Sequence, residues 1–236
     1  MNNLQHIYEP ERLLLVWRCA PSKGMRTRRL VALIEKNVND DEVCLRYLKN
    51  SEDFALALES GFEGYPAFEI SVDNHCKGVV DAFMRRLPPR KRDDFKDYLK
   101  RHRLADIQNL SDMALLAYTN AKLPSDGFEL YPDLSEARPP FELIIEIAGF
   151  HYQNGLTVDD VFIGDPVSFK AESDNQHDKN AVGIYSGGRK LGFVDRAQAP
   201  AFRKWKARGY SVAGTIERIN GTAERPSVYV FVSVKS

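Results

Sequence analysis

The chain has 236 residues, of which 43% are hydrophobic and 28% are charged, a composition typical of soluble globular proteins. Its 33 Lys and Arg residues balance 33 Asp and Glu residues, so net charge does not indicate a polyanionic partner. No apolar run approaches the roughly 20 residues that span a bilayer, and the N-terminus lacks the features of a signal peptide. We therefore expect a cytoplasmic protein without a membrane partner.

The three cysteines give no metal or disulfide pattern. Cys19, Cys44 and Cys76 are isolated, and neither CxxC nor Cys/His ligand spacing occurs around them. This usage is typical of a reducing compartment. The sequence therefore predicts no disulfide framework, no metal site and no other cofactor.

The first part of the chain predicts a mixed α+β domain. Segments rich in branched and aromatic residues, at 12–19, 28–36 and 42–49, are typical of a strand meander. A short helix is expected from the capping residue Ser51 to Gly61. Two further helices separated by Pro88 and Pro89 are expected within 79–104, and another begins at Ser111.

Residues 85–103 are strongly basic, with nine Lys or Arg against three Asp. A run of this kind is typical of a solvated helix face, and it also suits a second nucleic-acid surface. The sequence leaves both interpretations open.

A change of pattern divides the chain into domains of about 1–135 and 139–236. Pro132, Pro139 and Pro140 with Ser135 predict a short stiff linker. Beyond it, six strand candidates and one helix follow at short intervals, which predicts a small β-barrel or a tight sandwich. The strand candidates are at 141–150, 165–172, 180–186, 189–196, 210–220 and 227–234, and the helix is at 197–209.

A polar cluster at 174–180 precedes one of these strands, in the stretch AESDNQHDKNAVGIY. Its spacing matches neither HExxH nor an EF-hand, and no catalytic triad accompanies it, so we expect a protein that is not an enzyme. Asp and Asn bond to downstream backbone amides, which favours a simple turn. Loops on rigid scaffolds also carry binding groups, so a ligand-binding loop stays open.

The segment 172–199 resembles the core of the HIRAN domain, and the likeness covers about 141–234. The family pattern is an acidic or polar residue, then Asn-x-x-Asp-x-Asn-Ala-Val/Ile, a strand and a turn, then Lys/Gln-Ile/Leu-Gly-Tyr/His-Val/Leu and a basic residue. The residues that match it in register are Asn175, Asp178, Asn180, Ala181, Val182, Leu191, Gly192, Val194 and Arg196. The resemblance implies that the C-terminal domain, which follows the α+β N-terminal domain, is a small, mostly antiparallel OB-like β-barrel with one helix.

The resemblance also implies a partner, which is single-stranded DNA held by its 3′ end. In that family the end of the first strand stacks on a base, the Asn-x-x-Asp loop contacts the terminal nucleotide, and the basic residue holds a phosphate. The positions that carry over are His151, Tyr152, Asn175, His177, Asp178, Phe193 and Arg196.

Between Arg189 and Arg208 the sequence has seven Lys or Arg residues and one acidic residue. This excess suits contacts with phosphates, whose neutralisation makes binding salt-dependent. We expect the interleaved Phe202 and Trp205 to pack on the barrel, because they are three residues apart on a helix. The possible phosphate contacts are Arg189, Lys190, Arg203 and Lys204.

The N-terminal domain bears a weaker resemblance, to the N-terminal subdomain of HipA-like proteins, through Arg46-Tyr47 and residues 62–68. In those proteins this subdomain is a non-catalytic module that contacts partners, and no kinase motif follows here. Two hypotheses without catalysis result, and a hidden nuclease or other enzyme, suggested only by scattered carboxylates and five His, is a third. One is a bacterial or phage DNA-binding protein acting in DNA repair, DNA processing or phage–host defence. The alternative is a protein-interaction module, antitoxin-like or a counter-defence inhibitor, that acts through the N-terminal domain.

Overall fold

The computed structural model describes residues 3–19, 27–37, 42–123, 125–176, 178–222 and 224–236. The chain forms two compact units. The N-terminal unit comprises Glu9–His102 and Gln108–Asp133, and the C-terminal unit comprises residues 3–8, Arg103–Ile107 and Leu134–Ser236. The expected division at 135–139 assigns residues 3–8 and Arg103–Ile107 to the first domain. Both lie far in sequence from the strands with which they cluster, so no local pattern indicates this arrangement.

The N-terminal unit contains a four-stranded antiparallel sheet in the order β3-β2-β1-β4. Its first three strands are the expected meander. The fourth strand contradicts part of the expected linker, because Pro132 is its last residue and pairs with Leu13. Proline is tolerated there because β4 is an edge strand. The bounds are β1 Arg12–Arg18, β2 Arg28–Lys36, β3 Val43–Tyr47 and β4 Phe128–Pro132.

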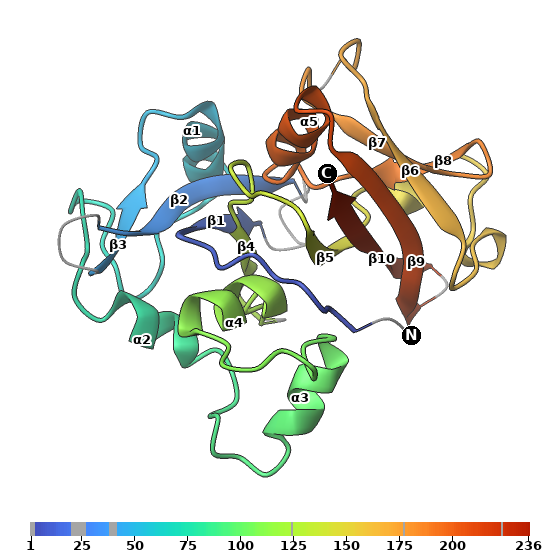
Figure 1. Ribbon diagram of the computed structural model, residues 1–236. Helices are drawn as coiled ribbons and strands as arrows, with labels where there is room; N and C mark the ends of the chain where they lie inside the picture. The colour runs from blue at the N-terminus through green and yellow to red at the C-terminus, as the bar shows by residue number, and fades with distance from the viewer. Residues whose placement is uncertain (1–2, 20–26, 38–41, 124, 177, 223) are drawn as a thin grey trace. The chain divides into compact units, whose positions relative to one another are not determined.

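The helices of this unit begin and end near the expected residues. The Ser51 hydroxyl accepts a hydrogen bond from the Phe54 amide at 3.1 Å, and Ser111 caps a later helix in the same way. Helix α1 packs against β2 (Figure 1). The bounds are α1 Glu52–Glu59, α2 Val79–Met84, α3 Phe95–Arg101 and α4 Asp112–Thr119.

The basic stretch 85–103 is partly neutralised within the N-terminal unit. The buried guanidinium of Arg86 lies 2.5 Å from Asp126 and also donates to the Phe128 carbonyl at 3.1 Å. Three further cations form ion pairs within this unit, which are Arg90–Asp112, Arg92–Asp94 and Lys100–Asp97, and Arg103 pairs with Glu217 in the C-terminal unit. These pairings favour the interpretation as a charged helix face over a second nucleic-acid surface.

A disulfide joins Cys44 to Cys76, so the expectation of no disulfide is wrong for this pair. Cys44 lies in β3, and an antiparallel bridge between Leu45 and His75 brings the second cysteine beside that strand. A separation of 32 residues hides this neighbourhood from the sequence pattern. Cys19 is free and buried.

The C-terminal unit contains a six-stranded antiparallel sheet in the order β5-β10-β9-β6-β7-β8. In Figure 1, β9 and β10 are the long pair next to the C-terminus. All six expected strands and the expected helix are confirmed. The bounds are β5 Phe141–Glu146, β6 Pro166–Ala171, β7 Val182–Ser186, β8 Arg189–Phe193, α5 Ala199–Ala207, β9 Ser211–Thr222 and β10 Arg225–Lys235.

The two edges of this sheet meet at one point. Ala148, just after β5, forms an antiparallel bridge with Phe193 at the end of β8, with N–O distances of 2.8 and 2.9 Å. Among the described residues, β5 and β8 share this isolated bridge and not a continuous hydrogen-bonded ladder. The sheet therefore approaches a barrel without closing into one. Gly192 permits the approach, because a Cβ atom there would lie 2.5 Å from the Ala148 carbonyl oxygen.

Helix α5 packs its aromatic residues inward, as expected. Phe202 and Trp205 are buried, and the indole nitrogen donates to the Leu134 carbonyl at 2.8 Å. The ring of Phe202 lies 4.9 Å from that of Phe169 on β6. Among the described residues, no helix combines the length and apolar character needed to cross a membrane.

Candidate nucleic-acid interface

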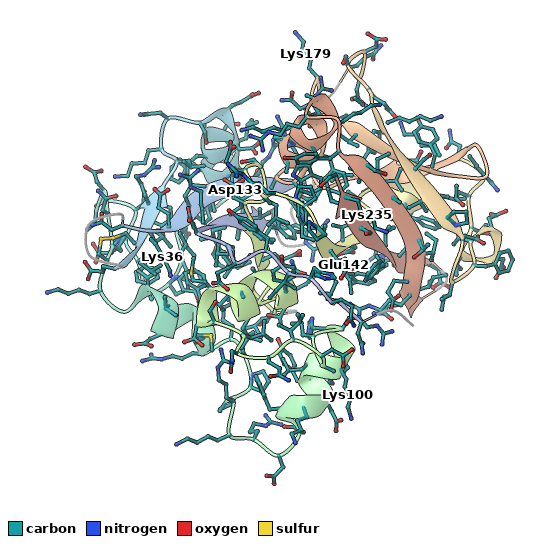
Figure 2. The ribbon with its side chains drawn as sticks, viewed as in Figure 1. Lys36, Lys100, Asp133, Glu142, Lys179 and Lys235 are labelled. Atoms are coloured by element: carbon teal, nitrogen blue, oxygen red, sulfur yellow. A yellow bond between two sulfur atoms is a disulfide. The ribbon has the colours of Figure 1, made fainter. Side chains whose placement is uncertain are left out.

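The polar loop between β6 and β7 is built from two side-chain-to-backbone turns. The Asn175 side-chain oxygen accepts a hydrogen bond from the Asp178 amide at 3.1 Å, and Asp178 accepts one from the Asn180 amide at 2.8 Å. The expected Asx turns are therefore present. Figure 2 shows Lys179 at the tip of the loop, pointing away from the sheet. The turns hold the Asp178 carboxylate in one orientation.

The second oxygen of Asp178 faces Arg196. The arginine Nε lies 3.8 Å from Asp178 Oδ2, at the outer limit of an ion pair, and its side chain is 36% exposed. Arg196 follows β8 by three residues, so the loop and the end of that strand meet here. Two positions expected to act together are thus adjacent, with the cation accessible to solvent.

Two aromatic rings flank Gly149. A Cβ atom on Gly149 would lie 3.9 Å from Cδ2 of both Phe193 and Tyr152, so both rings border the same position. Gly149 has φ +73°, which turns the chain from β5 into a short 3-10 helix containing His151 and Tyr152. Tyr152 is 69% exposed, and its ring lies 3.9 Å from that of His151. The exposed ring of Tyr152 and the half-buried ring of Phe193 therefore both border Gly149.

A polar network adjoins these rings, centred on Glu172. Its carboxylate accepts hydrogen bonds from Lys190 Nζ at 2.7 Å and from the Tyr185 hydroxyl at 2.6 Å. Lys190 also lies 3.9 Å from the centre of the Phe193 ring. Gly183 makes room for the carboxylate, because a Cβ atom there would lie 2.2 Å from a Glu172 oxygen. Sequence reasoning missed Glu172 and Tyr185, since only the strand pairing shows that they share a face.

The network shifts two pKa values in opposite directions. The hydrogen bond to Glu172 is the main reason that the pKa of Tyr185 rises to about 12. Burial raises the pKa of Glu172, but the hydrogen bonds from Lys190 and Tyr185 outweigh it and lower the pKa overall. Glu172 is therefore ionised at neutral pH and orients Lys190 beside the Phe193 ring.

Replacing Glu172 with glutamine is expected to lower the Tyr185 pKa from about 12 toward its ordinary value near 10. The parent's raised pKa contributes stability that is fully present below pH 10 and is lost as pH rises through 12. Ultraviolet titration of tyrosinate, with Tyr185→Phe identifying the signal, measures the shift. An unchanged titration in the Glu172→Gln variant would contradict the network.

The four possible phosphate contacts have different surroundings. Arg189 pairs with Asp160 at 2.7 Å, and Lys204 pairs with Glu136. Arg203 donates weakly to the Ser173 hydroxyl at 3.5 Å. Of the four, Lys190 is the one that the structure places against an aromatic ring of the candidate interface.

The predicted site residues thus fall into two groups that the segment 193–196 connects. One group holds His151, Tyr152 and Phe193, and the other holds Asn175, Asp178 and Arg196. His177 lies outside the described residues. The assignment of these residues to a DNA contact stays a prediction.

Comparisons with known proteins find a family match within the C-terminal unit. Residues 140–235 match the family model of the HIRAN domain. A crystal structure of a protein from Lactobacillus plantarum is similar with 20% identity and a TM-score of 0.34, covering 39% of this chain and 92% of that chain. The crystal structure of the HIRAN domain of human HLTF is similar with 18% identity and a TM-score of 0.33, covering 39% and 74%. No curated protein matches the chain.

The family match confirms the resemblance noted for the C-terminal part. It does not extend to the N-terminal unit, for which the likeness to HipA-like proteins finds no support in these comparisons. That likeness stays a prediction.

Proposed function

We propose that the HIRAN domain at residues 140–235 binds single-stranded DNA, with preference for a free 3′ end, and acts without catalysis. The observation that carries this proposal is that Tyr152, which is exposed, and Phe193, which is half-buried, border Gly149, while the segment 193–196 leads from Phe193 to the Asp178–Arg196 ion pair. The family supports a DNA partner in general. The preference for single strands and ends rests on the chemistry of the site.

Each part of the site suits one part of a nucleotide. An exposed ring such as Tyr152 stacks on an unpaired base, which a duplex does not offer. Arg196 and Lys190 supply cations for phosphates, so affinity should fall as salt concentration rises. Asp178 can accept a hydrogen bond from a terminal hydroxyl, which an internal nucleotide lacks.

Replacing Asp178 with asparagine is expected to reduce the preference for a 3′-hydroxyl over a 3′-phosphate by about tenfold. The change keeps the oxygen that accepts from the Asn180 amide, so the turn survives while the negative charge is lost. Fluorescence anisotropy with oligonucleotides of matched sequence and different 3′ ends measures the preference.

The matched control is Asp174→Asn, which removes a charge from an exposed position of the same loop. We expect it to leave the end preference intact. Equal behaviour of the two variants would exclude Asp178 from end recognition. Incubating labelled DNA with the protein and Mg²⁺ or Mn²⁺ tests the absence of catalysis, and cleavage would overturn that part of the proposal.

A role in DNA repair, DNA processing or phage–host defence extends the proposal to the cell. We further propose a bacterial or phage origin, a cytoplasmic location and a protein partner for the N-terminal unit. One structural feature supports a protein partner, because the N-terminal unit has its own sheet and core outside the HIRAN match. Pull-down from a nuclease-treated lysate tests it, and recovery of one stoichiometric protein would support it.

A further inference from the structure

A pocket of about 150 Å³ lies within the C-terminal unit, between helix α5 and strands β6, β7 and β9. Its wall carries three aromatic rings, those of Phe169, Phe202 and Tyr210. Two cations, Arg203 and Lys206, complete its polar side. No acidic residue lines it among the described part of the chain. The pocket therefore combines aromatic surface with uncompensated positive charge.

Arg203 supplies a second and independent observation. Its Nη1 atom is buried and has no hydrogen-bond partner among the described residues. The other terminal nitrogen donates to the Ser173 hydroxyl at 3.5 Å, so the guanidinium is held in place from one side. A buried donor without an acceptor is costly and uncommon in native proteins. Arg203 is therefore a pocket-lining cation whose hydrogen-bonding capacity is not fully used within the protein.

The pocket is separate from the rings of Tyr152 and Phe193, and its Arg203 is also one of the four possible phosphate contacts. Side chains alternate between the two faces of a strand. Phe169 and Ala171 of β6 line the pocket, whereas Lys170, which stacks on Tyr185, and Glu172 belong to the opposite face. A nucleotide stacked on Tyr152 and Phe193 thus leaves the pocket unoccupied.

We propose that this pocket binds a small aromatic anion, a single aromatic ring joined to a phosphate group directly, as in phenyl phosphate, or through a ribose, as in a pyrimidine nucleotide. A cavity of this volume accommodates one benzene-sized ring. Arg203 and Lys206 place two positive charges on the pocket wall, and these attract a phosphate group. The ligand comes either from free nucleotide or from one nucleotide of a strand, and the inference does not depend on the proposed function.

Isothermal titration of the full chain with phenyl phosphate and with uridine monophosphate tests the proposal. We expect saturable binding of both and weaker binding of inorganic phosphate, which lacks the ring. Arg203→Met removes the charge and keeps the length of the side chain, and it should weaken binding by about tenfold or more. Ala171→Phe fills the pocket and leaves Arg203 in place, so it should abolish binding while the protein stays folded.

Arg208→Met is the matched control, because Arg208 lies next to the C-terminal end of the same helix and pairs with Glu136 outside the pocket. It should bind as the parent does. Competition by an oligothymidylate against phenyl phosphate indicates a strand as the source, and its absence indicates free nucleotide. Absence of saturable binding by the parent, or equal binding by Arg203→Met and Arg208→Met, would overturn the proposal.

Discussion

Replacing Tyr152 with alanine is expected to weaken single-stranded DNA binding by about 5- to 150-fold, which corresponds to about 1–3 kcal/mol of base stacking. The side chain is 69% exposed and its ring lies 3.9 Å from that of His151, itself exposed, so the fold should tolerate the change. The exposure of so large a ring is what makes the effect specific to binding. Fluorescence anisotropy gives the affinity, and urea unfolding verifies that stability is retained.

Phe162→Ala is the matched control for this variant. Phe162 is an aromatic residue of the same unit with a similar exposure of 65%, in the turn before β6, and it does not lie within 4 Å of a Cβ atom added at Gly149. Its loss should leave the affinity unchanged. If Tyr152→Ala binds as tightly as the parent, the aromatic surface is not the base-stacking platform. If both variants lose affinity equally, nonspecific hydrophobic contact explains the binding better.

The elements of this fold follow from local sequence because their signals are local. The strands of the HIRAN domain are short alternating or apolar runs bounded by turn residues, and the Gly187-Gly188 turn has positive φ at both positions, as a tight hairpin requires. Ser51 and Ser111 cap helices where the sequence places them. Each of these features depends on neighbours within a few residues.

The features that sequence analysis missed depend on distant neighbours. Cys76 reaches Cys44 because the chain returns to the side of β3. Residues 3–8 join the C-terminal unit, where the His6 carbonyl accepts from the Glu142 amide at 2.8 Å. Periodic patterns in the sequence do not predict such contacts, because loops of many lengths close at a similar cost in chain entropy.

The residues of the candidate site show the same difference between local and distant contacts. Asn175 and Asp178 form the turns that their residue types predict, because both partners lie within three residues. Glu172 gains its role from Lys190, which is 18 residues away and reaches it only because β6, β7 and β8 are neighbours. The family pattern locates the loop, and the strand register then shows which side chains accompany it.

Replacing Gly192 with alanine is expected to destabilise the C-terminal unit by about 2–5 kcal/mol, the sum of a backbone and a packing effect. Gly192 has φ +145°, a conformation that residues with a side chain rarely adopt. The added Cβ would lie 2.5 Å from the Ala148 carbonyl oxygen, and this is backbone that cannot move without breaking the Ala148–Phe193 bridge. Because the bridge positions Phe193 beside Gly149, DNA binding should weaken together with stability.

Gly188→Ala separates the two effects. Gly188 also has positive φ, +82°, but nothing lies within 4 Å of an added Cβ atom. It should therefore lose only the backbone contribution, about 1–2 kcal/mol, and bind DNA as the parent does. Urea unfolding of both variants measures the difference. Equal destabilisation would mean that the sheet edges do not need to approach closely at Gly192, and the meeting of β5 and β8 would then not be what positions the aromatic surface.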